Sequence, residues 1–266
     1  MPEEAAELAP KISEKAEVLF QLGPINFTNS LMTMWITMAV LLVLAFVATR
    51  RIRTNPEAAL IPAGLQNVAE SVIEMLERLV QQAMGKYTSR MLPVSATFFI
   101  FIVAANWFSL LPGIGTIWIP VHEIHHGEEI LVAAPLLRPA TADLNMTLAL
   151  AITAFLVIHG AGIAAHGPLG HFKEVSKLAA LAPVFILIEL FVVVSLSFRL
   201  FGNLFAGEVL LNGPMIAGLA LGHIPLIGVI FLTLELLFGL IQGVIFTMLS
   251  LVFTSLSVAT AAHEEH

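Results

Sequence analysis

The sequence contains no cysteine, which excludes disulfide bonds and thiolate metal sites. Charged residues are also scarce: they make up 12% of the 266 residues, whereas soluble domains average about 25%. So few charges cannot cover the surface of a globular protein, and 58% of the residues are hydrophobic. The composition therefore predicts that lipid is the solvent for much of the chain.

The N-terminal segment lacks the basic start and the apolar core of a secretory signal, so we expect no cleaved leader. The net charge of -7 is spread through loops, which argues against a nucleic-acid partner. We expect an N-terminal segment on the outer side over residues 1–27 and a single membrane domain over residues 28–266.

Long apolar runs predict the membrane-crossing helices, since about 20 apolar residues cross a hydrocarbon core of ~30 Å. The expected spans cover residues 28–53, 91–111 and 143–165, with an outer loop at 112–142. Residues 176–262 then form a hairpin of two helices, each longer than the bilayer is thick. We expect both helices of this hairpin to tilt steeply.

A different pattern precedes the second span. Between Leu65 and Met84 the apolar residues recur every three or four positions, with glutamates and arginine on the opposite face. This predicts an amphipathic helix over 57–86 that lies along the membrane surface or docks on a partner, and does not span. The fold class is thus an all-α integral membrane protein, with about five membrane-crossing helices and one amphipathic surface helix.

The basic residues indicate the orientation. If the first span runs from outside to inside, only Lys11, Lys15 and Arg138 fall on the outer side. Eight others fall on the inner side: Arg50, Arg51, Arg53, Arg78, Lys86, Arg90, Lys173 and Lys177. This distribution satisfies the positive-inside rule and predicts an outer N-terminus and a cytoplasmic C-terminus.

The last third of the chain contains very few ionisable groups. Besides His223, residues 178–262 include only Glu189, Arg199, Glu208 and Glu235. A charge near the bilayer centre costs several kcal/mol, so these residues indicate a function. The structural alternative for each carboxylate is an ion pair that joins two helices. For Arg199 no carboxylate lies three or four residues away on the same helix.

The spacing of these groups suggests a path for protons. Along one helix, Glu189 lies about 15 Å from Arg199 toward the inner side and Glu208 about 13 Å toward the outer side. Asn203 shares the face of Arg199, and Gln242 shares the face of Glu235.

Asp143 and Asn145 open the third span at its outer end, so with Glu208 and Glu235 they form a predicted outer cluster. Carboxylates crowded at low dielectric can bind and release protons near neutral pH. A guanidinium stays charged at any accessible pH, so Arg199 separates the two polar approaches and blocks a direct leak.

Two other classes of function were considered. A secondary transporter predicts internal repeats and discontinuous helices, and no convincing repeat is present. His122, Glu123 and His126 match the HExxH pattern of zinc proteases, which requires both histidines on one helix face. Pro120 and Gly127 flank this motif, so we interpret it as a solvated loop, with incidental metal binding as the alternative, and expect no metal site.

Five stretches carry a resemblance to a known family. They are NFTNSLMTM, LPVSATFFIFIVAANWFSLLPG, TADLNMTLAL, SLSFRLFGNLFAGE and LIQGVIFTMLS, in this order between Ile25 and Ala261. This series resembles subunit a of the F-type ATP synthases, a rotary complex. The resemblance implies a proton-translocating stator subunit that is not catalytic alone and needs no cofactor.

The resemblance also implies roles for single residues. Arg199 corresponds to the essential arginine that faces a ring of c subunits, each with a proton-binding carboxylate. The other matched positions are amides near that arginine (Asn203, Gln242), the outer half-channel (Glu208, Glu235), its entrance (Asp143, Asn145) and the inner half-channel (Glu189). The interval from Glu189 to Arg199 is about one helical turn shorter than the family pattern, and some members have histidine at the position of Glu235.

The implied partners are the c-subunit ring, around Arg199 and Gln242, the peripheral-stalk b subunits, the remainder of the complex and the lipid bilayer. The implied location is a bacterial inner membrane.

Overall fold

A computed structural model describes residues 16–23, 25–54, 57, 61–125, 128–176, 182–212 and 225–259. Predictions about Lys11, Lys15, His126, Lys177 and His223 lie outside these residues. The backbone is described at His122, Glu123, Lys173 and Glu189, but the side chains are not.

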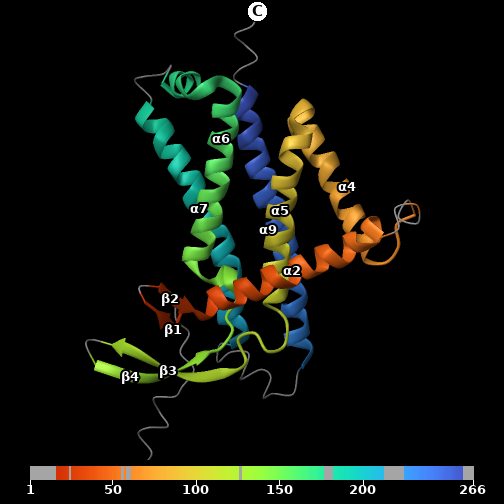
Figure 1. Ribbon diagram of the computed structural model, residues 1–266. Coiled ribbons are helices and arrows are strands. Elements are labelled where there is room, and N and C mark those ends of the chain that lie inside the picture. The colour runs from red at the N-terminus through yellow and green to blue at the C-terminus, as the bar shows by residue number, and fades with distance from the viewer. Residues whose placement is uncertain are drawn as a thin grey trace, which may run out of the picture. The chain divides into compact units, whose positions relative to one another are not determined.

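Long helices make up most of the described chain (Figure 1). They are α2 (Asn29–Thr54), α4 (Leu65–Met84), α5 (Thr88–Phe108), α6 (Leu144–Ser176), α7 (Ala182–Asn212) and α9 (Pro225–Ala259). Two short 3-10 helices, η1 (Gly85–Tyr87) and η2 (Ala140–Ala142), precede α5 and α6. Five helical segments of the described residues are long and apolar enough to cross a membrane, so the predicted fold class is confirmed.

The two last helices have the predicted excess length. α7 has 31 residues and α9 has 35 residues, which rise about 46 Å and 52 Å at 1.5 Å per residue. Both values exceed a hydrocarbon core of ~30 Å, so a steep tilt in the membrane stays the prediction.

Two hairpins lie outside the helices. β1 (Val18–Leu22) pairs antiparallel with β2 (Ile25–Thr28), directly before α2. β3 (Trp118–His125) pairs antiparallel with β4 (Glu128–Pro135), from Trp118↔Pro135 to His125↔Glu128. The prediction of a loop over 112–142 did not include this second hairpin. His122 and Glu123 lie in strand β3, so they lack the helical backbone that the zinc-protease motif requires.

Helix α6 bends where the predicted third span ends. Gly167 has φ 73° inside the helix, in the left-handed region that glycine enters without a steric cost. The straight segment that precedes it, Leu144–Gly167, is the part long and apolar enough to cross a membrane. The break in the helix at Gly167 lies two residues beyond the predicted end of the third span.

The chain divides into two compact units, which are described separately. Unit 1 comprises residues 1–38, 103–147 and 198–241, and unit 2 comprises residues 39–102, 148–197 and 242–266. In unit 1 the two hairpins share a small apolar core, where Leu19 packs against Val121 and Ala134. Unit 1 also contains most of the buried polar groups considered below.

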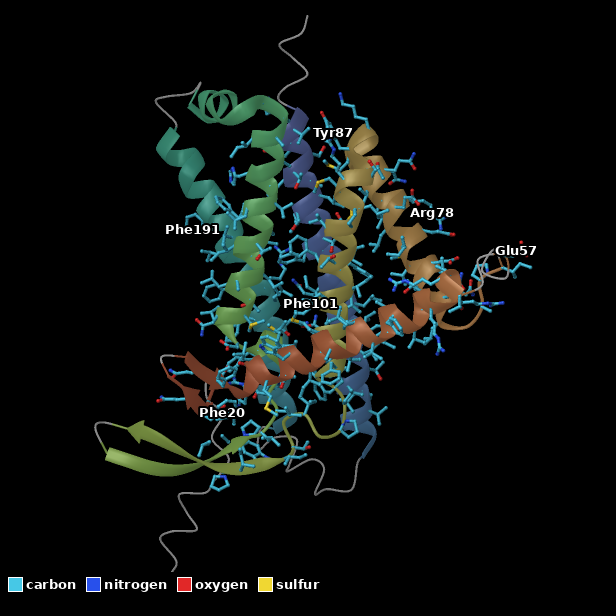
Figure 2. The ribbon with its side chains drawn as sticks, viewed as in Figure 1. Phe20, Glu57, Arg78, Tyr87, Phe101 and Phe191 are labelled. Carbon is cyan, nitrogen blue, oxygen red and sulfur yellow. The ribbon has the colours of Figure 1, made fainter. Side chains whose placement is uncertain are left out.

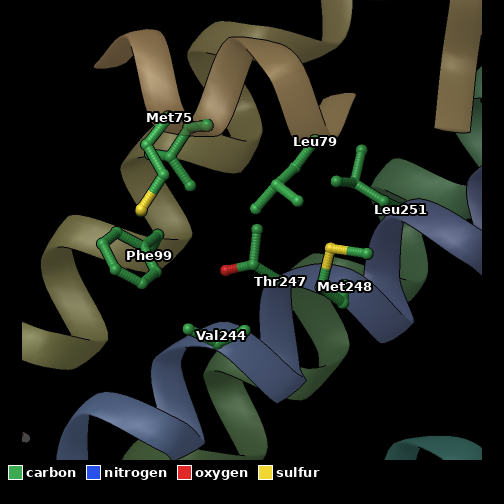
Figure 3. Close-up of a pocket in the computed structure, with 8 residues that line it drawn as sticks. Met75, Leu79, Phe99, Val244, Thr247, Met248 and Leu251 are labelled. Carbon is green, nitrogen blue, oxygen red and sulfur yellow. The ribbon is translucent and has the colours of Figure 1, made fainter. Parts of the chain in front are cut away.

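In unit 2 the amphipathic helix α4 docks on other helices of the same chain. Its buried residues Leu76, Val80 and Met84 face α5 and the end of α9, and Ser255 Oγ donates a hydrogen bond to the Ala83 carbonyl at 2.9 Å. A small apolar pocket at this contact is lined by Met75, Leu76, Leu79, Phe99, Val244, Thr247, Met248 and Leu251 (Figure 3). Arg78 is exposed on the opposite face (Figure 2). The apolar face of α4 therefore packs within the chain itself, and its predicted position along the membrane surface stays a prediction.

Candidate functional site

A cluster of buried polar side chains lies in unit 1, at the start of α2 and around the segment that leads into α6. Its members are 5% exposed or less: Asn29, Ser30, Asn106, Arg138, Thr141 and Asp143. Buried polar groups are costly unless they are hydrogen-bonded, so each must have a partner. The following contacts show how these groups satisfy one another.

Asp143 forms the N-cap of α6. Its Oδ1 accepts hydrogen bonds from the backbone N–H of Asn145 at 3.0 Å and from Asn145 Nδ2 at 3.1 Å. Its Oδ2 accepts a hydrogen bond from Ser30 Oγ at 2.8 Å, which ties the start of α6 to the start of α2. The predicted entrance residues are thus in contact, with Asp143 buried and Asn145 exposed.

Asn29 links the first helix to the N-terminal segment. Its Nδ2 donates to Glu17 Oε2 at 2.7 Å and to the Pro135 carbonyl at 2.9 Å. Its Oδ1 accepts from the backbone N–H of Ser30 at 2.9 Å. One amide therefore holds β4, α2 and the residue before β1 together.

Arg138 forms an ion pair with one of the predicted channel carboxylates. Its Nε and Nη2 lie 3.2 Å and 3.1 Å from Glu208 Oε2, although the two residues are 70 positions apart. Nη1 lies 3.9 Å from Glu17 Oε2. The arginine side chain is 1% exposed, so this pair is almost fully removed from solvent. The structural alternative for Glu208, an ion pair between two segments, is therefore present.

Glu235 reaches from α9 to α7 beside Glu208. A Cβ added at Gly207 would collide with the Glu235 carboxyl group, which therefore lies directly against the α7 backbone. The predicted pairing of these two glutamates in the outer cluster is thus visible in unit 1.

A second set of contacts fixes α9 against α5. Asn106 Nδ2 donates to the Gly239 carbonyl at 3.3 Å, and Trp107 Nε1 donates to the Leu236 carbonyl at 3.0 Å. Asn106 Oδ1 accepts from Thr141 Oγ at 2.9 Å. These bonds position the part of α9 that carries Glu235.

Arg199 and Asn203 lie on α7, four residues apart and therefore on one face. Arg199 is exposed, and Asn203 is partly buried. Within the described residues the Arg199 guanidinium forms no ion pair. Exposed apolar residues surround it in the chain, including Phe198 and Val194.

The two remaining predicted residues belong to unit 2. Gln242 is 6% exposed on α9, and its Nε2 donates no hydrogen bond to any described residue. Glu189 lies on α7, and its side chain is not described. Its assignment to an inner approach stays a prediction.

Sequence reasoning missed Arg138, Glu17, Asn29, Ser30 and Asn106. Arg138 belongs to the predicted outer loop, where it is isolated among apolar residues and followed by Pro139, Ala140 and the TADLN stretch. That isolation is the one signal that could have indicated a buried ion pair. The residue types of the others are too common near helix ends to stand out.

Among the described residues, no group of three or more histidine, aspartate or glutamate side chains is placed to hold an ion. The cluster instead combines carboxylates, amides and hydroxyls, which can hold water and exchange protons.

These findings define a multi-pass helical membrane protein with a buried cluster of ionisable groups. The model of one family, described as the ATP synthase A chain, matches residues 31–255. The chain belongs to this family, and the resemblance seen in the sequence is confirmed.

Similar proteins of several organisms support the same family membership. ATP synthase subunit a of Mycobacterium ulcerans is 32% identical over 242 residues, which cover 90% of this chain and 89% of the relative. The protein of the same name from Moorella thermoacetica is 33% identical over 238 residues, which cover 88% and 93%. ATP synthase subunit a 1 of Hahella chejuensis is 30% identical over 239 residues, which cover 90% and 87%.

Proposed function

We propose that this chain is the proton-translocating stator subunit of the membrane sector of an F-type ATP synthase. It is a membrane component of the complex and not an enzyme by itself. In this proposal it loads and unloads the carboxylates of a rotating c-subunit ring through two offset half-channels. Ring rotation is thereby coupled to ATP synthesis or hydrolysis.

The observation that carries the proposal is the exposed position of Arg199. It stands in the segment Phe191–Glu208, which is apolar enough to cross a membrane. A guanidinium exposed to lipid is costly, and none of the described residues neutralises it. A partner that presents carboxylates to this face of α7 removes that cost, and a ring of proton-binding helices is such a partner.

The outer cluster supports the outer half-channel. Asp143 and Asn145 are hydrogen-bonded to each other, and Glu235 lies beside Glu208. We assign Asp143 and Asn145 to the entrance and the two glutamates to the lining. Arg199 then separates this path from the inner half-channel, to which we assign Glu189.

We assign to Asn203 and Gln242 the roles of the two amides that act together with the arginine, as the family resemblance implies. Asn203 shares the α7 face of Arg199, and the Gln242 amide is buried in unit 2 without a described acceptor for its Nε2. We further propose that b subunits of the peripheral stalk bind the chain. We also propose that the chain lies in a bacterial inner membrane. Its N-terminus is on the outer side and its C-terminus on the cytoplasmic side, as the positive-inside rule indicates.

The test is Arg199→Ala in membrane vesicles that contain the assembled complex. We expect loss of both ATP synthesis and ATP-driven proton pumping, because passing rotor carboxylates no longer meet a permanent cation. The matched control is Arg78→Ala, on the exposed face of α4, which should pump normally. Coupled pumping at the wild-type rate in Arg199→Ala would refute the proposal.

A further inference from the structure

Arg138 has no role in the two half-channels proposed above. It is nevertheless the most deeply buried charged side chain in the part of the chain that the structure describes. It is 1% exposed, and two of its nitrogens lie 3.1–3.2 Å from Glu208 Oε2. A hydrogen-bonded pair of opposite charges at this burial has a fixed geometry, because neither group can turn to water.

The guanidinium is also held from its other side. Glu17 Oε2 lies 3.9 Å from Arg138 Nη1 and accepts a hydrogen bond from Asn29 Nδ2 at 2.7 Å. Asn29 in turn donates to the Pro135 carbonyl, three residues before Arg138. The cation is thus fixed to the segment between β4 and α6, and Glu208 is held at a set position relative to that segment.

The neighbouring glutamate differs. Glu235 lies against Gly207, the residue before Glu208, but within the described residues its carboxyl group forms no hydrogen bond or ion pair. Two adjacent carboxyl groups at the same end of unit 1 therefore have unequal surroundings. Glu208 is paired with a buried cation, whereas Glu235 has no partner of opposite charge among the residues that the structure describes.

We infer that Arg138 is a positioning residue of the outer half-channel, which holds Glu208 in a fixed ion pair and leaves Glu235 as the carboxyl group that exchanges protons. An arginine does not release its proton at accessible pH, so Arg138 acts through Glu208 and not as a carrier. A proton from water on the outer side binds the Glu235 carboxylate, which later releases it toward the rotor. This inference rests on the proposed function of the chain.

The experiment measures passive proton conductance of the membrane sector in vesicles from which the catalytic sector has been stripped. The variants are Arg138→Gln, Glu208→Gln, the double variant Arg138→Gln/Glu208→Gln, Arg138→Lys and Glu235→Gln. Subunit content of the purified complex is measured for each, so that loss of assembly is separated from loss of conduction. Arg51→Gln, an exposed arginine at the end of α2, is the matched control.

We expect each single neutralisation of the pair to lower conductance about tenfold or more, because one buried charge is left without its partner. The double variant removes both charges and should conduct better than either single variant. Arg138→Lys keeps the positive charge but loses the planar guanidinium, from which two nitrogens contact Glu208. Its conductance should therefore fall between those of Arg138→Gln and the wild type. Glu235→Gln should not conduct protons.

Three outcomes would overturn the inference. The first is wild-type conductance in Arg138→Gln, and the second is wild-type conductance in Glu235→Gln. The third is a conductance of the double variant that does not exceed the conductance of the less active single variant. If Arg138→Gln or Glu208→Gln alone prevents assembly, the double variant and Arg138→Lys still decide, since a fixed pair predicts that both assemble. Failure of this inference is distinct from failure of the proposed function, which Arg199→Ala tests by coupled pumping and which does not depend on Arg138.

Discussion

At the scale of single residues, the buried ion pair shows why charges in an apolar bundle are informative. Removing one partner of a buried pair typically costs about 3–5 kcal/mol, because the other charge is left unpaired. Arg138 and Glu208 are in that situation, whereas Arg199 is exposed on α7. The same residue type is thus buried in an ion pair at one position and exposed at the other, where we propose that a partner binds.

Asp143 combines two roles that substitutions can separate. As N-cap of α6 it accepts a hydrogen bond from the Asn145 backbone, and as a carboxylate it accepts one from Ser30. Asp143→Asn keeps an N-cap oxygen, so we expect unchanged thermal stability and reduced passive proton conductance. Asp143→Ala should reduce conductance as well and destabilise the chain by about 0.5–2 kcal/mol.

Thermal unfolding of the purified complex and conductance in stripped vesicles measure the two effects. Equal loss of stability in both variants would show that the cap is not what Asp143 contributes. Wild-type conductance in Asp143→Asn would remove it from the proposed entrance.

At the scale of elements, α7 and α9 approach closely at Gly207. A Cβ there would collide with the Glu235 carboxyl group, so Gly207→Ala should push Glu235 out of its position beside Glu208. We expect a conductance several-fold or more below wild type, with normal subunit content. Conductance in stripped vesicles is the measurement.

The control for this prediction is the same substitution on another membrane helix. Gly160→Ala on α6 adds a methyl group where no atom lies within 4 Å, so conductance should not change. Equal conductance in Gly207→Ala and Gly160→Ala would contradict the close approach of α9 to α7.

Element boundaries were largely predictable because length and apolar periodicity are local properties. The expected spans 28–53, 91–111 and 143–165 correspond to α2, α5 and the straight part of α6. The β3–β4 hairpin was not predicted, although each of its strands has 8 residues. Strand pairing depends on a partner segment, which a helical period does not reveal.

At the scale of the whole molecule, the orientation can be tested directly because the chain has no cysteine of its own. Ser89→Cys, at the start of α5, and Thr116→Cys, after its end, place one thiol at either side of the same span. Both side chains are exposed. We expect a membrane-impermeant thiol reagent to label Thr116→Cys in intact cells and Ser89→Cys only in inverted vesicles.

The opposite pattern would reverse the proposed topology. The wild-type chain, which has no thiol, gives the background of the labelling. Variants should retain ATP-driven pumping, so that labelling reports the assembled complex.

The sequence by itself determined the number of helical segments long and apolar enough to cross a membrane and the apolar face of α4, and it led us to propose functional roles for Arg199, Glu208 and Glu235. These follow from the cost of burying polar groups in lipid and from the period of the helix, and both act locally along the chain. Only the tertiary structure decided that Glu208 pairs with Arg138, 70 residues away, and that Glu235 lies against Gly207. The free-energy cost of burying a charge implies that a partner of opposite charge exists. The sequence does not show which residue that partner is, because the packing of distant segments determines it.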